Sequence, residues 1–108
     1  MLSGYRLMWM MVLFDLPVLT RKERKAANGF RHFLLDQGFE MAQFSVYMRH
    51  CVGKEQVEAM TRRIGKAVPS TGKVHIVTLT DKQYETTVCF DGRACQPQRK
   101  NPEQYVLF

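Results

Sequence analysis

The stretch "WMMVLFDLPVL", residues 9–19, decides the fold of this chain. Every residue from position 7 to position 14 is apolar, and the run ends at Asp15, shortly before Pro17. An apolar run of this length that stops at a turn signal predicts a buried strand over residues 6–16. Because its apolar residues do not alternate with polar ones, the strand needs cover on both faces. Helices readily cover one face of a sheet in a small domain, which leaves the second face for a partner subunit.

Two amphipathic helices are predicted after this strand. The first runs from about Thr20 to about Gln37, because Thr20 and Glu23 form a capping box and Gly38 is a typical helix terminator. The second follows Gly53 and stops at Pro69. Its apolar stripe has helical spacing and consists of Val57, Met60, Ile64 and Ala67 or Val68.

Further strands complete the predicted sheet. Residues 39–51 alternate in polarity, as one long bent strand or as two short ones, and residues 73–80 are rich in β-branched side chains. Residues 86–90 are predicted to be another strand before an Asp-Gly turn. The order of elements predicts an α+β sandwich with two helices on one face of an antiparallel sheet. We divide the chain into a domain over residues 1–90 and a C-terminal extension over residues 91–108.

Composition narrows the possible partners. The chain has 108 residues, a formal net charge of +6 and a pI near 9.5, so we expect one domain that binds a polyanion, with nucleic acid the first candidate. Its three cysteines form no C-x-x-C pair, which argues against a disulfide framework and favours reduced thiols in a cytoplasmic protein. The apolar run is shorter than the roughly 20 residues that a membrane-spanning helix needs, and we expect no membrane partner.

Asp15 is the candidate site residue. A carboxylate at the end of a strand can bind Mg²⁺ or Mn²⁺ through its oxygens. It can equally cap the turn before Pro17, and its position alone leaves both alternatives open. No second acid is close to it in sequence, because the next one, Glu23, belongs to the capping box. A metal site at Asp15 therefore depends on a dimer whose two-fold axis brings a second Asp15 opposite the first.

Basic residues gather at the start of the first predicted helix, where positive charge opposes the helix dipole. This placement favours binding of an external anion such as a phosphate backbone, although a solvated helix face is the simpler alternative. The candidate nucleic-acid-binding residues are Arg21, Lys22, Arg24, Lys25 and Arg31. The three histidines have no metal-ligand spacing and are expected at the surface or within strands.

The chain ends in an apolar stub that follows a polar segment with two prolines. We expect the stub to dock as an edge strand on its own sheet or on a partner's. Its residues are Tyr105, Val106, Leu107 and Phe108.

Three segments together resemble the small CRISPR-associated endoribonuclease family, the smaller of the two proteins shared by most CRISPR adaptation systems. They are "MVLFDLP", "RKERKAANGFRHFLLDQGF" and "AQFSVY". The resemblance covers nearly the whole chain in order and spacing, and it depends on the ordered set because no single motif is specific. It departs from the common pattern at Phe14, where a tyrosine is frequent, and at Lys22, where an arginine is frequent. The missing hydroxyl puts a catalytic role of side chain 14 in doubt, and Lys22 lacks bidentate geometry.

The resemblance implies a ferredoxin-like (βαββαβ) fold with an extra C-terminal strand, and a homodimer whose sheets face each other. It implies that two Asp15 side chains share Mg²⁺ or Mn²⁺ and that residues 105–108 contact the partner protomer and the integrase subunit. The resemblance further implies a role in bridging integrase subunits on captured DNA during spacer acquisition, and metal-dependent nuclease activity is present in some members of the family and absent in others. A basic ferredoxin-like RNA-binding module without enzymatic activity remains the alternative.

Overall fold

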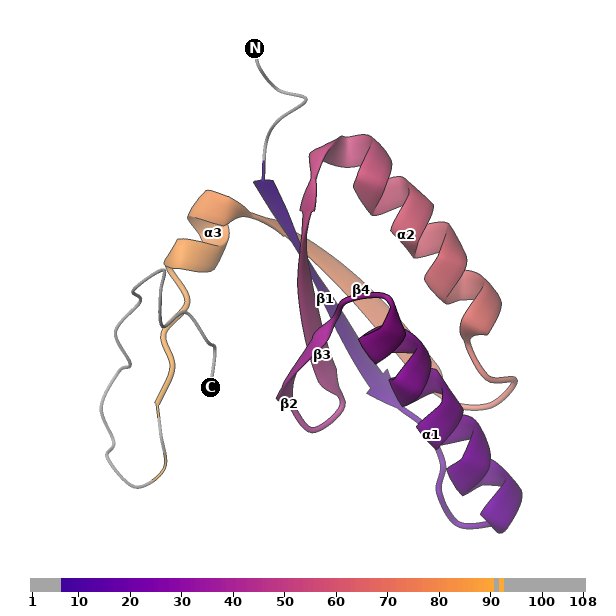
Figure 1. The fold of residues 1–108 in the computed structure, drawn as a ribbon. Coiled ribbons are helices and arrows are strands. Elements are labelled where there is room, and N and C mark those ends of the chain that lie inside the picture. The colour runs from indigo at the N-terminus through magenta and orange to yellow at the C-terminus, as the bar shows by residue number, and fades with distance from the viewer. Residues whose placement is uncertain (1–6, 91, 93–108) are drawn as a thin grey trace.

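A computed structural model of the chain describes residues 7–90 and residue 92. Its elements in chain order are β1 (Leu7–Asp15), α1 (Arg21–Asp36), β2 (Glu40–Gln43), β3 (Val46–Val52), α2 (Gly53–Ala67), β4 (Lys73–Thr80) and α3 (Asp81–Glu85). Figure 1 shows α1 and α2 side by side on one side of the sheet, with α3 on the other side. The C-terminal extension, with its predicted terminal strand, lies outside the described residues apart from residue 92.

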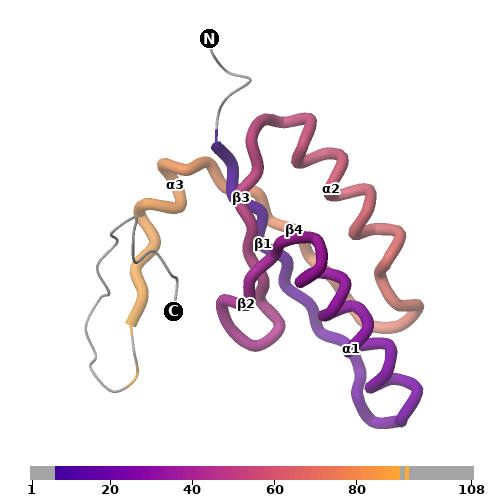
Figure 2. Tube along the Cα trace, viewed as in Figure 1, coloured from indigo at the N-terminus to yellow at the C-terminus, as the bar shows by residue number. Residues whose placement is uncertain are grey.

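The four strands form one antiparallel sheet in the order β2-β3-β1-β4. Together with α1 and α2, this order makes the predicted ferredoxin-like α+β sandwich, in which the long apolar strand β1 lies in the middle of the sheet. The chain path in Figure 2 shows how the two helices return to the same side after β1 and after β3. The predicted fold class is therefore confirmed.

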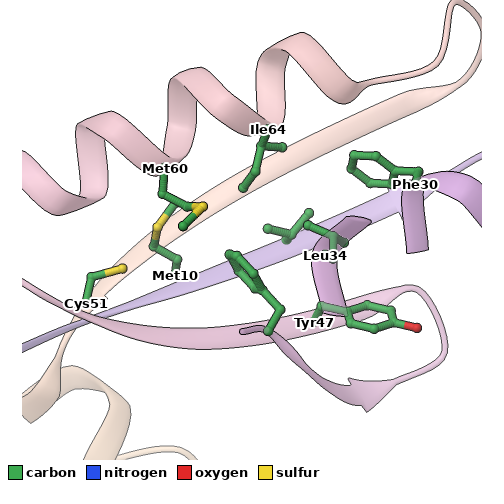
Figure 3. Packing of buried hydrophobic residues seen from close by; sticks show 9 residues of the cluster. Met10, Phe30, Leu34, Tyr47, Cys51, Met60 and Ile64 are labelled. Carbon is green, nitrogen blue, oxygen red and sulfur yellow. The ribbon is translucent and has the colours of Figure 1, made fainter. Parts of the chain in front are cut away.

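The hydrophobic core lies between the sheet and the two long helices. Met10 and Val12 of β1 are fully buried there, and Tyr47 and Cys51 of β3 extend the same layer. The helices contribute the buried residues Phe30, Leu34, Met60 and Ile64, which meet the strand residues in Figure 3. Alternate residues of β1 thus face α1 and α2, and the residues between them point to the other side of the sheet.

The predicted ends of α1 are confirmed. The Thr20 hydroxyl accepts from the Glu23 backbone N–H at 3.0 Å, and the Glu23 carboxylate accepts from the Thr20 N–H at 2.9 Å. After the helix, Gly38 has a positive φ of 91°, a conformation in which glycine has no steric cost. The half-buried Arg49 donates to the Gln37 carbonyl at 3.0 Å and so satisfies a carbonyl at the end of α1. Glu23 is thereby committed to the cap, as predicted.

The structure decides between the alternatives for residues 39–51 and corrects the prediction for residues 86–90. Residues 39–51 form two strands, β2 and β3, because Phe44 and Ser45 make a turn between them. The strand predicted over residues 86–90 is wrong: the chain forms the short helix α3 at residues 81–85, and of residues 86–90 only Phe90 makes a strand-type bridge. A second capping box, between Thr80 and Gln83, starts this helix.

The helix α3 covers one end of the second sheet face. Tyr84 is 3% exposed and stacks on the Trp9 ring, with their centroids 4.1 Å apart. The Trp9 indole N–H also donates to the Asp81 carboxylate at 2.9 Å. Part of the apolar surface of β1 is therefore covered by the chain itself, which the sequence did not predict. No helix in the described part of the chain is long and apolar enough to cross a membrane.

Candidate functional site on the second face of the sheet

We call the sheet surface opposite α1 and α2 the second face. In β1 it is formed by the residues that alternate with the core residues Met10 and Val12, and the strand register assigns its neighbours in β3 and β4. Its residues are Leu7, Trp9, Met11, Leu13 and Asp15 of β1, Val46, Met48, His50 and Val52 of β3, and Lys73, His75, Val77 and Leu79 of β4. The face is thus apolar along most of β1 and becomes charged at the end of that strand.

Asp15 is the last residue of β1 and lies on the second face, where it is exposed. Its carboxylate makes no hydrogen bond or ion pair with any described residue, so it does not cap the turn before Pro17. The loop before β4 packs against this strand end. A Cβ atom on Gly72 would lie 2.8 Å from the Asp15 carbonyl oxygen and 2.7 Å from the Leu16 side chain, so only glycine fits there. The backbone that carries the carboxylate is therefore tightly packed on the β4 side.

The turn between β2 and β3 supports the same strand end on its other side. The Phe14 N–H donates to the Ser45 carbonyl at 3.0 Å. Ser45 has a φ of +62°, the left-handed region that few residues other than glycine adopt. The neighbouring Phe44 is 91% exposed at the turn. The turn is therefore joined to the end of β1 through the backbone of Phe14, the residue before Asp15.

The residues present suit a divalent cation as one half of a site. Within residues 7–90 and 92, no group of three or more His, Cys, Asp or Glu side chains could hold a metal ion. A single exposed carboxylate offers the oxygen ligands that Mg²⁺ and Mn²⁺ prefer, but one such group is too few for a protein site. A metal site at Asp15 would therefore need further ligands from a second chain.

The five predicted nucleic-acid-binding cations lie along α1, and none forms an ion pair with a described residue. Arg21, Lys22 and Lys25 are exposed in its first turns, and Arg31 is half-buried further along the helix. Arg24 differs from them, because its guanidinium donates to the carbonyls of Val18 at 3.2 Å and of Leu19 at 3.0 Å. Arg24 therefore stabilises the loop before α1 and has fewer donors left for a phosphate.

The three histidines lie at the surface, two of them within strands, as predicted. His32, His50 and His75 are exposed, and His50 lies edge-on to Trp9 with a centroid distance of 5.4 Å. Burial raises the pKa of the Cys51 thiol, and the positive charge of Arg49 opposes that shift only in part. Residues 105–108 lie outside the described residues.

Sequence reasoning missed Lys73. It is the first residue of β4 and the register partner of Asp15, so it lies beside the carboxylate on the second face. The signal for it was available in principle, because antiparallel pairing of the strand predicted over residues 6–16 with the strand predicted over residues 73–80 would place the start of one at the end of the other.

Comparison with known proteins identifies similar chains. The sequence model of the family described as "CRISPR associated protein Cas2" matches residues 8–87. A protein of Paracidovorax avenae named "CRISPR-associated endoribonuclease Cas2" is 58% identical over 108 residues, which is the full length of both chains. Proteins with the same name in Flavobacterium psychrophilum and Parvibaculum lavamentivorans are 45% and 44% identical, over 99% and 94% of this chain and 93% and 100% of their own.

Proposed function

Because the chain belongs to the CRISPR-associated protein Cas2 family, we propose that it is a nucleic-acid-binding homodimer of CRISPR adaptation whose two Asp15 side chains form a site for phosphodiester cleavage. The observation that carries this proposal is the position of Asp15. The carboxylate lies at the end of an apolar strip on the second face of the sheet, and the strip is suited to pairing with a second copy.

The proposed dimer joins the second faces of two chains. Met11, Leu13 and Val77 are partly exposed apolar residues in the middle of that face, between the end covered by α3 and the end that carries Asp15. Burying such a strip removes apolar surface from water, a gain of roughly 25 cal/mol per Å² before the entropic costs of association. A two-fold axis that passes close to the ends of both β1 strands brings the two carboxylates together.

In the proposed reaction, the two Asp15 carboxylates would hold a divalent cation between the chains. The cation would supply charge stabilisation at the phosphodiester and lower the pKa of water that is to attack the phosphorus atom. The protein's own part is to fix the carboxylates through the close packing at Gly72 and the hydrogen bond from the Phe14 N–H to the Ser45 carbonyl. Phe14 carries no hydroxyl, so its side chain takes no part in proton transfer.

The exposed basic side chains of α1 would bind nucleic acid. Arg21, Lys22 and Lys25 have no acidic partner among the described residues, so their charges are available to phosphate groups. Contacts of this kind bind the backbone of duplex DNA or RNA without reading its sequence. We favour duplex DNA, because a dimer presents two such helices to a long regular polyanion.

A second candidate function is a bridge without catalysis, in which the dimer holds integrase subunits and DNA while spacers are acquired. One carboxylate per chain and the absence of a side-chain hydroxyl at Phe14 favour this candidate. In it, the apolar stub at residues 105–108 docks on the partner protomer or on the integrase. Deletion of residues 105–108 is then expected to prevent co-purification with the integrase, and normal co-purification would refute the docking role.

A basic RNA-binding module remains the weaker alternative. Such modules usually stack bases on aromatic rings of an exposed sheet face. Here Trp9, the aromatic residue of β1 on the second face, is already stacked on Tyr84.

The cleavage proposal is tested with the variant Asp15→Asn. We expect it to lose Mg²⁺- or Mn²⁺-dependent cleavage of nucleic acid by about a hundredfold or more, while dimerisation and DNA binding persist. Asp36→Asn, which changes an exposed aspartate at the end of α1, is the matched control and should keep full activity. Equal cleavage by wild type and Asp15→Asn, in the presence or absence of a chelator, would show that the mechanism is wrong.

A further inference from the structure

Lys73 and Asp15 are opposite each other in neighbouring antiparallel strands. They are register partners at the end of the β1–β4 pairing, directly after the pair Phe14 and Val74. Phe14 and Val74 pack against the core between the sheet and the helices, so the next pair points to the second face. Side chains of directly opposite residues start with their Cβ atoms roughly 4.5–5.5 Å apart. A flexible lysine side chain at position 73 can therefore bring its ammonium group to the carboxylate or move it away.

The two side chains are exposed and have no competing partners among the described residues. Neither Asp15 nor Lys73 forms an ion pair with a described residue, and their own charged groups lie beyond ion-pair distance in this structure. Gly72 holds the backbone of the two strand ends in close contact, because a Cβ atom there would meet the Asp15 carbonyl at 2.8 Å. The backbone thus fixes the distance between the Cβ atoms of Asp15 and Lys73, while the rest of the lysine side chain can change its conformation.

We propose that Lys73 belongs to the Asp15 site and lowers the affinity of that site for a divalent cation. The inference rests on the proposed function, since it assumes that the paired carboxylates bind a metal ion. The ammonium group of Lys73 attracts the carboxylate that the cation needs as a ligand, and it repels the cation itself. Both effects weaken cation binding in the absence of substrate.

In a two-fold symmetric dimer, two Lys73 ammonium groups act on the same cation site. The completed site contains two carboxylates and two ammonium groups, so its formal charge is zero before a divalent cation enters. A cation then raises the charge to +2, which a bound phosphodiester reduces. Because of Lys73, the site binds a cation more tightly when an anionic substrate is also bound than when the substrate is absent. The coupling is reciprocal, so a bound cation also raises the affinity for the substrate.

The test measures Mn²⁺ binding to the full chain by isothermal titration calorimetry, without nucleic acid and in chloride buffer. Lys73→Met is expected to bind Mn²⁺ roughly three- to tenfold more tightly than wild type, as Coulomb energies of partly solvated charges at these separations predict. Lys73→Arg keeps the charge and is expected to bind within about twofold of wild type. Lys54→Met is the matched control, because it removes an exposed lysine where α2 begins, at the opposite end of the sheet.

The outcomes separate this inference from the proposed function. Unchanged or weaker Mn²⁺ binding in Lys73→Met, together with loss of binding in Asp15→Asn, would overturn the role of Lys73 and leave the metal site in place. Unchanged binding in Asp15→Asn would overturn the metal site and the inference with it. Tighter binding in Lys54→Met as well as in Lys73→Met would attribute the effect to net charge and also overturn the inference.

Discussion

Met11 and Val77 are register partners on the second face of the sheet, midway between the end that α3 covers and the end that carries Asp15. Val77 is 38% exposed and Met11 is partly exposed, although both lie within strands of a four-stranded sheet. In the proposed dimer these two apolar side chains lie in the interface between the second faces of the two chains. The pair is therefore the target of the first prediction.

A charge at this position should prevent dimerisation. Val77→Lys places an ammonium group in the middle of the proposed interface, where burial without a partner is costly. By light scattering after gel filtration, wild type should have twice the 12.6 kDa mass of one chain and the variant should have the mass of a monomer. Val18→Lys changes a 54% exposed valine in the loop before α1 and should stay dimeric. A dimeric Val77→Lys would place the interface elsewhere.

Nucleic-acid binding should depend on the exposed basic side chains of α1. The triple change of Arg21, Lys22 and Lys25 to Ala is expected to weaken duplex binding. The plot of log K against log salt should become shallower by about one unit for each phosphate group that the variant no longer binds. Arg24→Ala should instead lower the melting temperature, because Arg24 donates to two carbonyls of the loop before α1. An unchanged salt slope in the triple variant would exclude this surface of α1 as the binding site.

The contact between Trp9 and Tyr84 should stabilise the fold. Tyr84→Ala removes a buried ring and is expected to lower the free energy of unfolding by about 2–4 kcal/mol. Trp9 is the single tryptophan of the chain, so its fluorescence reports the docking of α3 and should shift to the red in this variant. Lys82→Ala, an exposed change on the same helix, should alter neither stability nor emission. A blue emission maximum retained in Tyr84→Ala would contradict this account of α3.

Stability should fall at alkaline pH because of Cys51. Burial raises the pKa of this thiol above its ordinary value of 9.0, with partial opposition from the charge of Arg49. The folded state therefore holds the proton more tightly than the unfolded state, and this contribution is complete below pH 9.0 and is lost as the pH rises through the folded pKa. The difference in unfolding free energy between wild type and Cys51→Ala should therefore shrink as the pH rises above 9.0. A constant difference would contradict the shift.

The sequence predicted those features of the fold that depend on local patterns. The ends of α1 followed from the Thr20 and Glu23 capping box and from Gly38, and the apolar run predicted β1 close to its observed limits. The short helix α3 was missed because its dominant contact joins Tyr84 to Trp9, which are distant in sequence. The T-x-x-Q capping box at Thr80 was a local signal for it, but the β-branched and aromatic residues at 86–90 favoured a strand.

The candidate site was also predictable only in part, because some of its features depend on contacts between residues that are distant in sequence. Asp15 could be identified because a single acid ends a long apolar run. Lys73 was missed, since its proximity to Asp15 comes from the pairing register of β1 with β4, and the sequence analysis did not assign which strands pair. The charge of Arg24 was equally visible in the sequence, whereas its hydrogen bonds to the Val18 and Leu19 carbonyls depend on the path of the loop.

The stoichiometry of Mn²⁺ binding tests most directly the central claim that two chains complete one site at Asp15. Titration calorimetry on the wild-type dimer should give one Mn²⁺ ion per two chains, and Asp15→Asn should abolish this binding. One ion for each chain, or binding that persists in Asp15→Asn, would contradict a metal site shared across the two-fold axis.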